Sequence, residues 1–222
     1  MCKYKSPNHH KMKQTIFSTA YLPPIAYLSA FLRANKVYIE HQENYVKQTY
    51  RNRCVIPTAN GLLSLTIPVK KGGLHNCPIH KVQIDYSQPW QRTHWKAIET
   101  AYNTSPFFLY YRDYFEVFYT QQNIATLFEY NMQLFNLILK LLGIEKPYSL
   151  TSEYIAAYGE ETDDFRHNFQ PKHKTEPFLA NFVFPPYRQV FADRLGFFQN
   201  TSCIDLLFNE GKLATDYLLE NC

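Results

Sequence analysis

The sequence predicts an α/β fold with an N-terminal β-α-β unit, a mixed sheet and a helical C-terminal half. Three observations indicate this class. An apolar run at residues 15–20 precedes an amphipathic segment at 25–34 and a second apolar run at 36–40. Two strand-like runs then flank an Asn-Gly pair. From about residue 90 onward, the apolar residues recur mostly at helical spacing.

The N-terminal unit is delimited by its breaks. Pro23 and Pro24 end the first strand, because proline lacks the amide hydrogen that a ladder needs. Parallel strands joined by a helix take a right-handed crossover and leave their carboxyl ends at one edge of the sheet. Ligands in such folds bind outside that edge. We therefore expect residues 19–24 and 41–45 to lie on one rim.

The middle of the chain is predicted to hold a hairpin, a further strand and three helices. Asn60-Gly61 is a strong hairpin signal between strands at 53–57 and 62–69. Residues 81–85 alternate in polarity, which predicts another strand. The helices are predicted at 89–103, 106–119 and 124–142, and the last of these is the longest and ends at Gly143.

The C-terminal third is less regular. Residues 149–158 fit either a strand or a helix, and residues 159–174 are polar without a period, which favours a long surface loop. A short helix is predicted at 187–194. Ser202 is a favoured residue type to cap the following helix, and a last helix is predicted after Gly211.

Composition favours a packed protein. The chain has 222 residues, of which 45% are apolar and 19% charged, so we expect a single domain over 15–222, rich in helices from about residue 90. Residues 1–14 are polar and basic and are predicted to be a flexible tail. No stretch approaches the ~20 apolar residues of a membrane span. With no secretory signal visible either, we expect a cytoplasmic protein.

Cysteine usage and net charge exclude several classes of function. Five cysteines form no C-x-x-C pair, which disfavours a disulfide framework or a zinc site. His75, Cys77 and His80 lack an evident fourth ligand, so we expect neither a metal nor another cofactor. A net charge of +4 spread along the chain does not give the basic face of a nucleic-acid-binding protein.

The densest cluster of cations and planar donors lies at residues 47–53. On an extended strand Arg51 and Arg53 would face the same side, and two guanidinium groups suit a phosphate or a carboxylate. A solvated strand start is the alternative. Lys47 adds charge, and Tyr50 suits stacking on a base or a sugar. The predicted substrate-binding residues are Tyr21, Lys47, Tyr50, Arg51, Asn52, Arg53, Asp205 and Asn209.

Candidates for acid–base chemistry follow from position. His41 comes directly after a predicted parallel strand, at the expected rim, and imidazole titrates near neutral pH. Glu40 and Glu43 are placed to orient it or to compete for its role. His94 lies in the first turn of a predicted helix, where a buried structural histidine is the alternative. The predicted catalytic residues are His41, Glu43 and His94.

Five blocks of sequence resemble one known family. They are YLPPIAYLSAF at 21–31, ENYVKQTYRNRCVI at 43–56, ANGLLSLTIPV at 59–69, WQRTHWKAIETAYNTSPFFLYYRDYF at 90–115 and QVFADRLGFFQNTSCIDLLFNEG at 189–211. Together and in this order they resemble the WbqC-like protein family. That resemblance implies a role in bacterial surface-polysaccharide (O-antigen) clusters, as an enzyme of sugar modification. Many members carry an acidic pair after the second strand, where this chain reads Glu40-His41-Gln42-Glu43.

Two functions therefore compete. The first is a transferase acting on a small-molecule substrate, a nucleotide-activated sugar or an acyl donor, with the cations holding the anion and His41 as the base. The second is a non-catalytic protein that binds a carbohydrate or a partner enzyme, which 18 Tyr and 17 Phe favour. RNA binding is disfavoured by the mild charge. The sequence makes no prediction of oligomeric state.

Overall fold

The computed structural model describes residues 13–121, 124–171 and 179–220. Its N-terminal unit is β1 (Gln14–Ser18), α1 (Ile25–Arg33) and β2 (Lys36–Glu40). The two strands pair in parallel, from Gln14 opposite Lys36 to Ser18 opposite Glu40. The predicted β-α-β unit is thus confirmed. Of the expected tail, residues 1–12 lie outside the described residues.

Two short strands extend the parallel sheet. β5 (Ser149–Leu150) pairs with β2, and β6 (Thr162–Asp164) pairs with β1, which gives the order β5-β2-β1-β6. The chain steps from β1 to β2 and then to β5 on one side, whereas β6 lies on the other side of β1. The carboxyl ends of β1 and β6 therefore form a topological switch point, which is where ligands bind in open α/β sheets.

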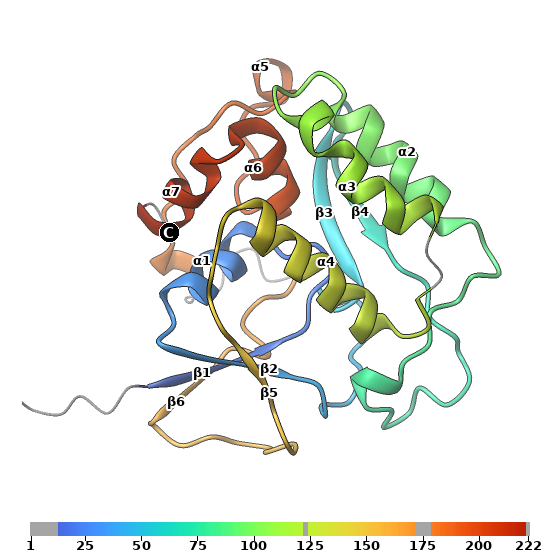
Figure 1. Cartoon of the computed structure of the whole chain (residues 1–222), viewed down its shortest axis with the longest axis vertical. Coiled ribbons are helices and arrows are strands. Elements are labelled where there is room, and N and C mark those ends of the chain that lie inside the picture. Colours follow the sequence, from blue (N-terminus) through green and yellow to red (C-terminus); the bar gives the residue numbers. More distant parts are fainter. Residues whose placement is uncertain (1–12, 122–123, 172–178, 221–222) are drawn as a thin grey trace, which may run out of the picture.

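The predicted hairpin is β3 (Arg53–Thr58) and β4 (Gly61–Thr66), which pair antiparallel. Gly61 has a φ of 99°, a conformation that glycine adopts without strain. The α/β class is confirmed, with parallel and antiparallel pairings in separate sheets. Figure 1 shows the parallel sheet at the bottom and the hairpin in the upper half.

Helices cover these sheets much as predicted. α2 (Trp90–Tyr102) and α3 (Phe108–Thr120) pack side by side next to the hairpin (Figure 1), and α4 (Leu127–Leu141) starts at Thr126, whose side chain accepts from the amide of Glu129. α6 (Cys203–Glu210) and α7 (Leu213–Glu220) lie on the other side of the molecule, against α1. At 15 residues, α4 is the longest helix in the described part of the chain.

Four local predictions are corrected. Residues 81–85 form no strand, because they follow a 3₁₀ turn, η1 (Ile79–Lys81), and make only isolated bridges. The predicted surface loop at 159–174 contains β6, too short to show a period. The short helix α5 is Ala192–Leu195, later than predicted, and a 3₁₀ turn, η2, covers Leu179–Asn181. Ser202 is the N-cap residue of α6, but its hydroxyl donates to the carbonyl of Leu22.

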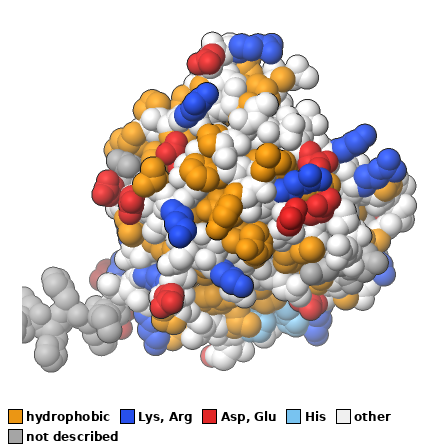
Figure 2. Space-filling model, turned by 45° about the horizontal axis from the view of Figure 1, so that its top comes forward, with side chains coloured by type: hydrophobic (Ala, Val, Ile, Leu, Met, Phe, Trp, Pro, Cys, Tyr) orange, Lys and Arg blue, Asp and Glu red, His pale blue; other side chains and the backbone are white. Residues whose placement is uncertain are grey.

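Aromatic rings supply much of the core. Phe17 of β1 packs edge-on against Tyr27 of α1 at 5.0 Å between ring centroids, and Phe31 meets Phe135 of α4 at 5.0 Å. On the face shown in Figure 2, lysine and arginine side chains are scattered among acidic and apolar ones. None of the described helices is long and apolar enough to cross a membrane.

Candidate functional site

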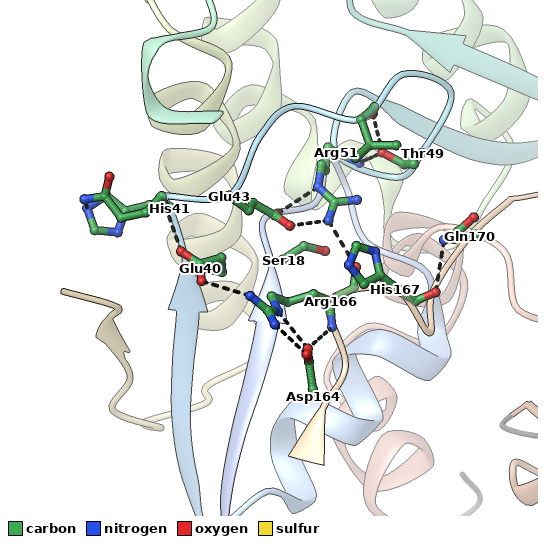
Figure 3. A network of polar contacts seen from close by, with 12 residues as sticks. Ser18, Glu40, His41, Glu43, Thr49, Arg51, Asp164, Arg166, His167 and Gln170 are labelled. Atoms are coloured by element: carbon green, nitrogen blue, oxygen red, sulfur yellow. Dashed lines mark hydrogen bonds and ion pairs between the residues drawn. The ribbon is translucent and has the colours of Figure 1, made fainter. Parts of the chain in front are cut away.

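Charged side chains are buried together at the carboxyl edge of the parallel sheet (Figure 3). The guanidinium of Arg51 forms a two-pronged ion pair with Glu43, from Nε to Oε1 at 2.8 Å and from Nη2 to Oε2 at 2.5 Å. Both side chains are under 5% exposed. Nη2 of Arg51 also donates to the backbone carbonyl of Arg166 at 3.1 Å. The donors of Arg51 are therefore directed at protein acceptors.

Arg166 holds the second half of this cluster. It donates from Nε to Oδ1 of Asp164 at 2.8 Å and from Nη2 to Oδ2 at 2.6 Å, and its Nη1 lies 3.4 Å from Oε2 of Glu40. The rings of Tyr154 and Tyr158 lie 5.1 and 5.0 Å from its guanidinium carbon. We call Glu40, Glu43, Arg51, Asp164 and Arg166 the ion-pair network.

The network shifts the acidity of its outermost carboxyl. Burial alone would raise the pKa of Asp164, but the hydrogen bonds and the positive charge of Arg166 bring the pKa below its usual value. Glu40 is fully buried, and its Oε1 accepts from the hydroxyl of Thr151 and from the amide of Gln42, each at 2.7 Å. These bonds tie the end of β2 to the chain around Thr151.

Two imidazoles stand beside the network. The rings of His41 and His80 have centroids 5.4 Å apart, and Nδ1 of His80 lies 2.7 Å from the carbonyl oxygen of His41. A carbonyl oxygen only accepts, so Nδ1 of His80 donates to it. Nε2 of His41 lies 3.1 Å from Nε2 of the Gln42 side chain. We call His41 and His80 the histidine pair.

His41 is tuned toward its neutral form. Burial lowers the pKa of His41, the charge of His80 lowers it further, and the nearby Glu40 opposes both effects. Its Nδ1 is buried and has no hydrogen-bond partner among the described residues. Buried polar atoms are nearly always hydrogen-bonded, so this unpaired atom is an exception within the fold. Within the described residues, no group of three or more His, Cys, Asp or Glu side chains is arranged to hold a metal.

A cavity of about 620 Å³ opens at the other end of the network. Figure 3 shows His41 at one end and Gln170 at the other, with the ion pairs between them. Gln170 lines the cavity and donates to the carbonyl of His167 at 3.1 Å. The cavity thus lies beside the chain that follows β6, at the topological switch point. We call it the aromatic cavity.

Among the described residues, the lining of the aromatic cavity carries no charge. Five phenylalanines, four aliphatic residues and a proline supply the apolar wall, and amides and hydroxyls supply the rest. Burial raises the pKa of Tyr50 to about 12, so its phenol is neutral at physiological pH. The lining residues are Tyr50, Val55, Leu62, Phe169, Gln170, Pro171, Leu179, Ala180, Phe182, Phe184, Phe197, Phe198, Gln199, Asn200 and Thr201.

The start of α1 is closed by the protein itself. The amide of Ile25 donates to the carbonyl of Thr201 at 3.0 Å, and the amide of Ala26 donates to Oδ1 of Asn200 at 2.9 Å. A loop of the C-terminal half therefore occupies two of the amides that are unpaired at the start of a helix.

The predicted cations do not meet in one depression. Arg51 lies in the turn before β3, so it does not share a strand face with Arg53. Arg53 is half-buried and donates from Nε to the hydroxyl of Thr66 at 3.2 Å, whereas Lys47 is exposed. Asn52 is buried and bonds the carbonyl of Ile67 at 2.9 Å. Of the predicted cluster, Tyr50 lines the cavity.

Tyr21 and His94 lie together in the interior. The hydroxyl of Tyr21 is 3.1 Å from Nδ1 of His94 and 2.7 Å from the hydroxyl of Tyr119. Burial lowers the pKa of His94 to about 4, partly offset by a hydrogen bond that the ring donates to the backbone of Thr66. His94 is therefore neutral over the physiological range and is engaged in a buried cluster.

Asp205 and Asn209 support the wall of the cavity. The carboxylate of Asp205 is fully buried and accepts from Tyr187, from Gln189 at 2.7 Å and from Thr201 at 3.0 Å, while Asn209 donates to its other oxygen at 3.3 Å. Burial raises the pKa of Asp205, although the hydrogen bonds from these donors act to lower it. Gln189 also bonds the backbone of the lining loop, so this cluster positions residues 197–201.

Sequence reasoning missed two parts of this edge. It did not join His80 to His41, because their contact depends on a loop 39 residues away in sequence. It also missed the aromatic cavity. The signal for the cavity was the run Phe197-Phe198-Gln199-Asn200 between two helices, where two rings are followed by two amides with no charge.

Comparisons with known proteins identify the family of this chain and one similar protein. The model of the WbqC-like protein family matches residues 19–175. A protein of Mycobacterium tuberculosis (strain ATCC 25618 / H37Rv), uncharacterized protein Rv1507c, is 28% identical over 229 residues, which is 93% of this chain and 97% of that protein. No solved structure matches.

Proposed function

The chain belongs to the WbqC-like protein family, and from this premise we propose that it is a transferase of bacterial surface-polysaccharide (O-antigen type) sugar modification. Its substrate is a small molecule with an anionic group, a nucleotide-activated sugar or an acyl donor. The reaction takes place at the carboxyl edge of the parallel sheet. We also propose a cytoplasmic location, supported by the free thiols of Cys54, Cys77 and Cys203.

The histidine pair is the single observation that carries this proposal. His41 follows β2 at the edge where α/β folds bind ligands, and its lowered pKa keeps an unprotonated imidazole available at neutral pH. The geometry supports His41 as the general base and His80 as a positioning residue, since His80 is fixed through the backbone of His41. Glu43 acts through Arg51 and not on the substrate.

Binding of the anion falls to Arg53, with Lys47 as a further charge. Arg51 and Arg166 are under 2% exposed and are paired with carboxylates, which leaves little of their charge for a ligand. Arg53 is half-buried beside the hairpin and is bonded to a neutral hydroxyl. An arginine bonded to a neutral partner keeps its full charge for a phosphate or a carboxylate.

A turnover assay tests the proposal. A panel of nucleotide sugars and acyl thioesters is incubated with the protein and an acceptor sugar, and release of the nucleoside diphosphate or of the thiol is measured. We expect turnover in the wild-type protein and a 10²–10⁴-fold loss of kcat in His41→Ala, since a general base contributes about that much. His75→Ala is the matched control, because His75 is exposed on a loop. Equal turnover in His41→Ala and wild type would contradict the assignment.

A non-catalytic carbohydrate-binding protein is the second candidate. It is favoured by one observation: Glu43 and His94, two of the three predicted catalytic groups, are engaged in internal bonds. In that case ligands raise the Tm of the protein without any being consumed, and His41→Ala binds them as tightly as wild type. The same assay therefore separates the two functions.

A further inference from the structure

We propose that the aromatic cavity is a binding site for a neutral sugar ring, and that Arg53 stands at its rim to hold an anionic substituent of the same ligand. This goes beyond the proposed function, because it assigns a ring-binding site at the opposite end of the ion-pair network from the histidine pair. It requires no catalytic step.

The lining determines what the cavity accepts. Sugar rings present an apolar face of C–H bonds and a rim of hydroxyls, and they pack on aromatic faces while amide side chains bond the hydroxyls. The rings of Phe182 and Phe184, both in this wall, are nearly parallel, at 15° with centroids 6.3 Å apart. Gln170, Gln199 and Asn200 contribute amides, and the neutral phenol of Tyr50 adds a hydroxyl.

The same lining argues against other occupants. Among the lining residues that the structure describes, a free phosphate inside the cavity would find no positive side chain, and burying a charge without a partner is costly. An acyl chain would leave the amides and hydroxyls facing hydrocarbon without hydrogen bonds. At about 620 Å³, the space lies within the ordinary range of small-molecule sites.

The polar end of the cavity is held in place before any ligand arrives. Asn200 has a φ of 51°, and its Oδ1 is taken by the amide of Ala26, which directs its Nδ2 elsewhere. The hydroxyl of Thr201 is anchored to the buried carboxylate of Asp205. Gln189 bonds both the amide and the carbonyl of Phe198, at 2.9 Å each. A wall fixed in this way loses little entropy on binding.

Arg53 reaches the cavity through the register of the hairpin. Side chains alternate along a strand, so Arg53 lies on the same face of β3 as Val55, which lines the cavity. Pro57 on that face pairs with Leu62, another lining residue. Residues two apart on a strand are separated by about 7 Å. An anionic group attached to a bound ring would thus find Arg53 at the mouth of the cavity.

Saturation-transfer NMR with neutral methyl pyranosides tests the proposal on the full chain. The panel contains hexopyranosides and N-acetylhexosaminides, with uridine and inorganic phosphate as separate arms. We expect saturation of the pyranoside C–H protons, with an affinity that phosphate does not change. Leu62→Trp fills the cavity and should weaken binding at least tenfold. Leu63→Trp is the matched control, since Leu63 is equally exposed on β4 but does not line this cavity, and it should bind within twofold of wild type.

Thermal melts show whether both tryptophan variants fold. If Leu62→Trp does not fold, Gln199→Leu serves instead, because Gln199 is an exposed lining residue, and it should weaken binding several-fold. The proposal is overturned if no pyranoside binds at millimolar concentration, if uridine alone binds, or if Leu62→Trp or its substitute binds like wild type. Because this readout is binding and not turnover, its failure is distinguishable from failure of the His41 assay.

Discussion

Two neighbouring regions of the sheet edge handle polar groups in opposite ways. In the ion-pair network the charged groups are buried and paired with one another. Arg51 and Arg166 are each about 1% exposed and are paired with carboxylates. The aromatic cavity keeps about 620 Å³ open, and its described lining residues are all uncharged. The comparison teaches that a cation within a dense cluster of cations in a sequence need not be directed at a ligand. Here Arg51 belongs to the scaffold of the sheet edge.

Removing one partner of the ion-pair network should give the largest effect and tests this comparison most severely. Arg51→Met leaves the carboxylate of Glu43 buried and unpaired, and we expect it to lower the free energy of unfolding by about 3–5 kcal/mol. Urea unfolding measures this change. In the double variant Arg51→Met/Glu43→Leu, most of that loss should be recovered.

The exposed pair between Lys13 and Asp163 provides the control for the network. Their side chains are 47% and 35% exposed, so Asp163→Asn should cost less than about 1 kcal/mol. If Arg51→Met is as mild as Asp163→Asn, the network does not hold the sheet edge together.

Acid unfolding separates the network from the other buried polar cluster. The pKa of His94 falls from 6.5 to about 4 on folding, so the folded state favours the neutral ring. Its contribution is present above pH 6.5 and is lost as the pH falls from about 6.5 to about 4, which amounts to ~3 kcal/mol. For Asp164, whose folded pKa is lowered, the loss comes only at more acid pH. We expect His94→Gln to flatten the stability profile between pH 6.5 and 4 and to leave the steeper loss below it; an unchanged profile would argue against a buried neutral His94.

Removing the charge of Arg53 tests whether this residue binds an anionic group at the rim of the cavity. Arg53→Gln should weaken binding of a sugar phosphate roughly tenfold, because hydrogen bonds to charged groups contribute about 1.5–3 kcal/mol. Binding of the corresponding neutral pyranoside should stay within twofold. Calorimetric titration measures both, with Arg92→Gln as the control because Arg92 is exposed on α2. Equal losses of affinity for the two ligands would mean that Arg53 maintains the shape of the cavity and does not bind the anionic group.

The smallest expected effect concerns the tyrosines around Arg166. Tyr154 is 49% exposed, and its ring lies 5.1 Å from the guanidinium, so Tyr154→Leu should cost about 0.5–1 kcal/mol in unfolding free energy. Tyr114→Leu on α3, where Tyr114 is 48% exposed, is the matched control and should cost less. Equal costs would show that the ring contributes only area.

The fold was largely readable from the sequence, since its main elements are long or sharply bounded. The β-α-β unit is framed by Pro23 and Pro24, and the hairpin by Asn60-Gly61. What escaped prediction depends on distant partners. β6 has three residues and exists because it pairs with β1, about 150 residues earlier. Residues 81–85 alternate because Val82 and Ile84 are buried, not because they form a ladder.

The site was less accessible to prediction, for a physical reason. The sequence does not show whether an arginine is paired with a carboxylate in the folded protein. Arg51 contacts Glu43 only because the turn between them folds back. Position after a strand did identify His41 and Glu40 as rim residues. The cavity is built from the β3–β4 hairpin with the turn before it, from the chain after β6 and from the loop before α6, and their convergence follows only from the topology.

Hydrogen–deuterium exchange with mass spectrometry tests the central claim most directly, that the neutral cavity binds the ligand while the charges beside it are scaffold. With a saturating methyl pyranoside, we expect slower exchange at residues 179–184 and 197–201, and no change at residues 40–43. Protection confined to residues 40–43, with the cavity wall exchanging as before, would contradict the account.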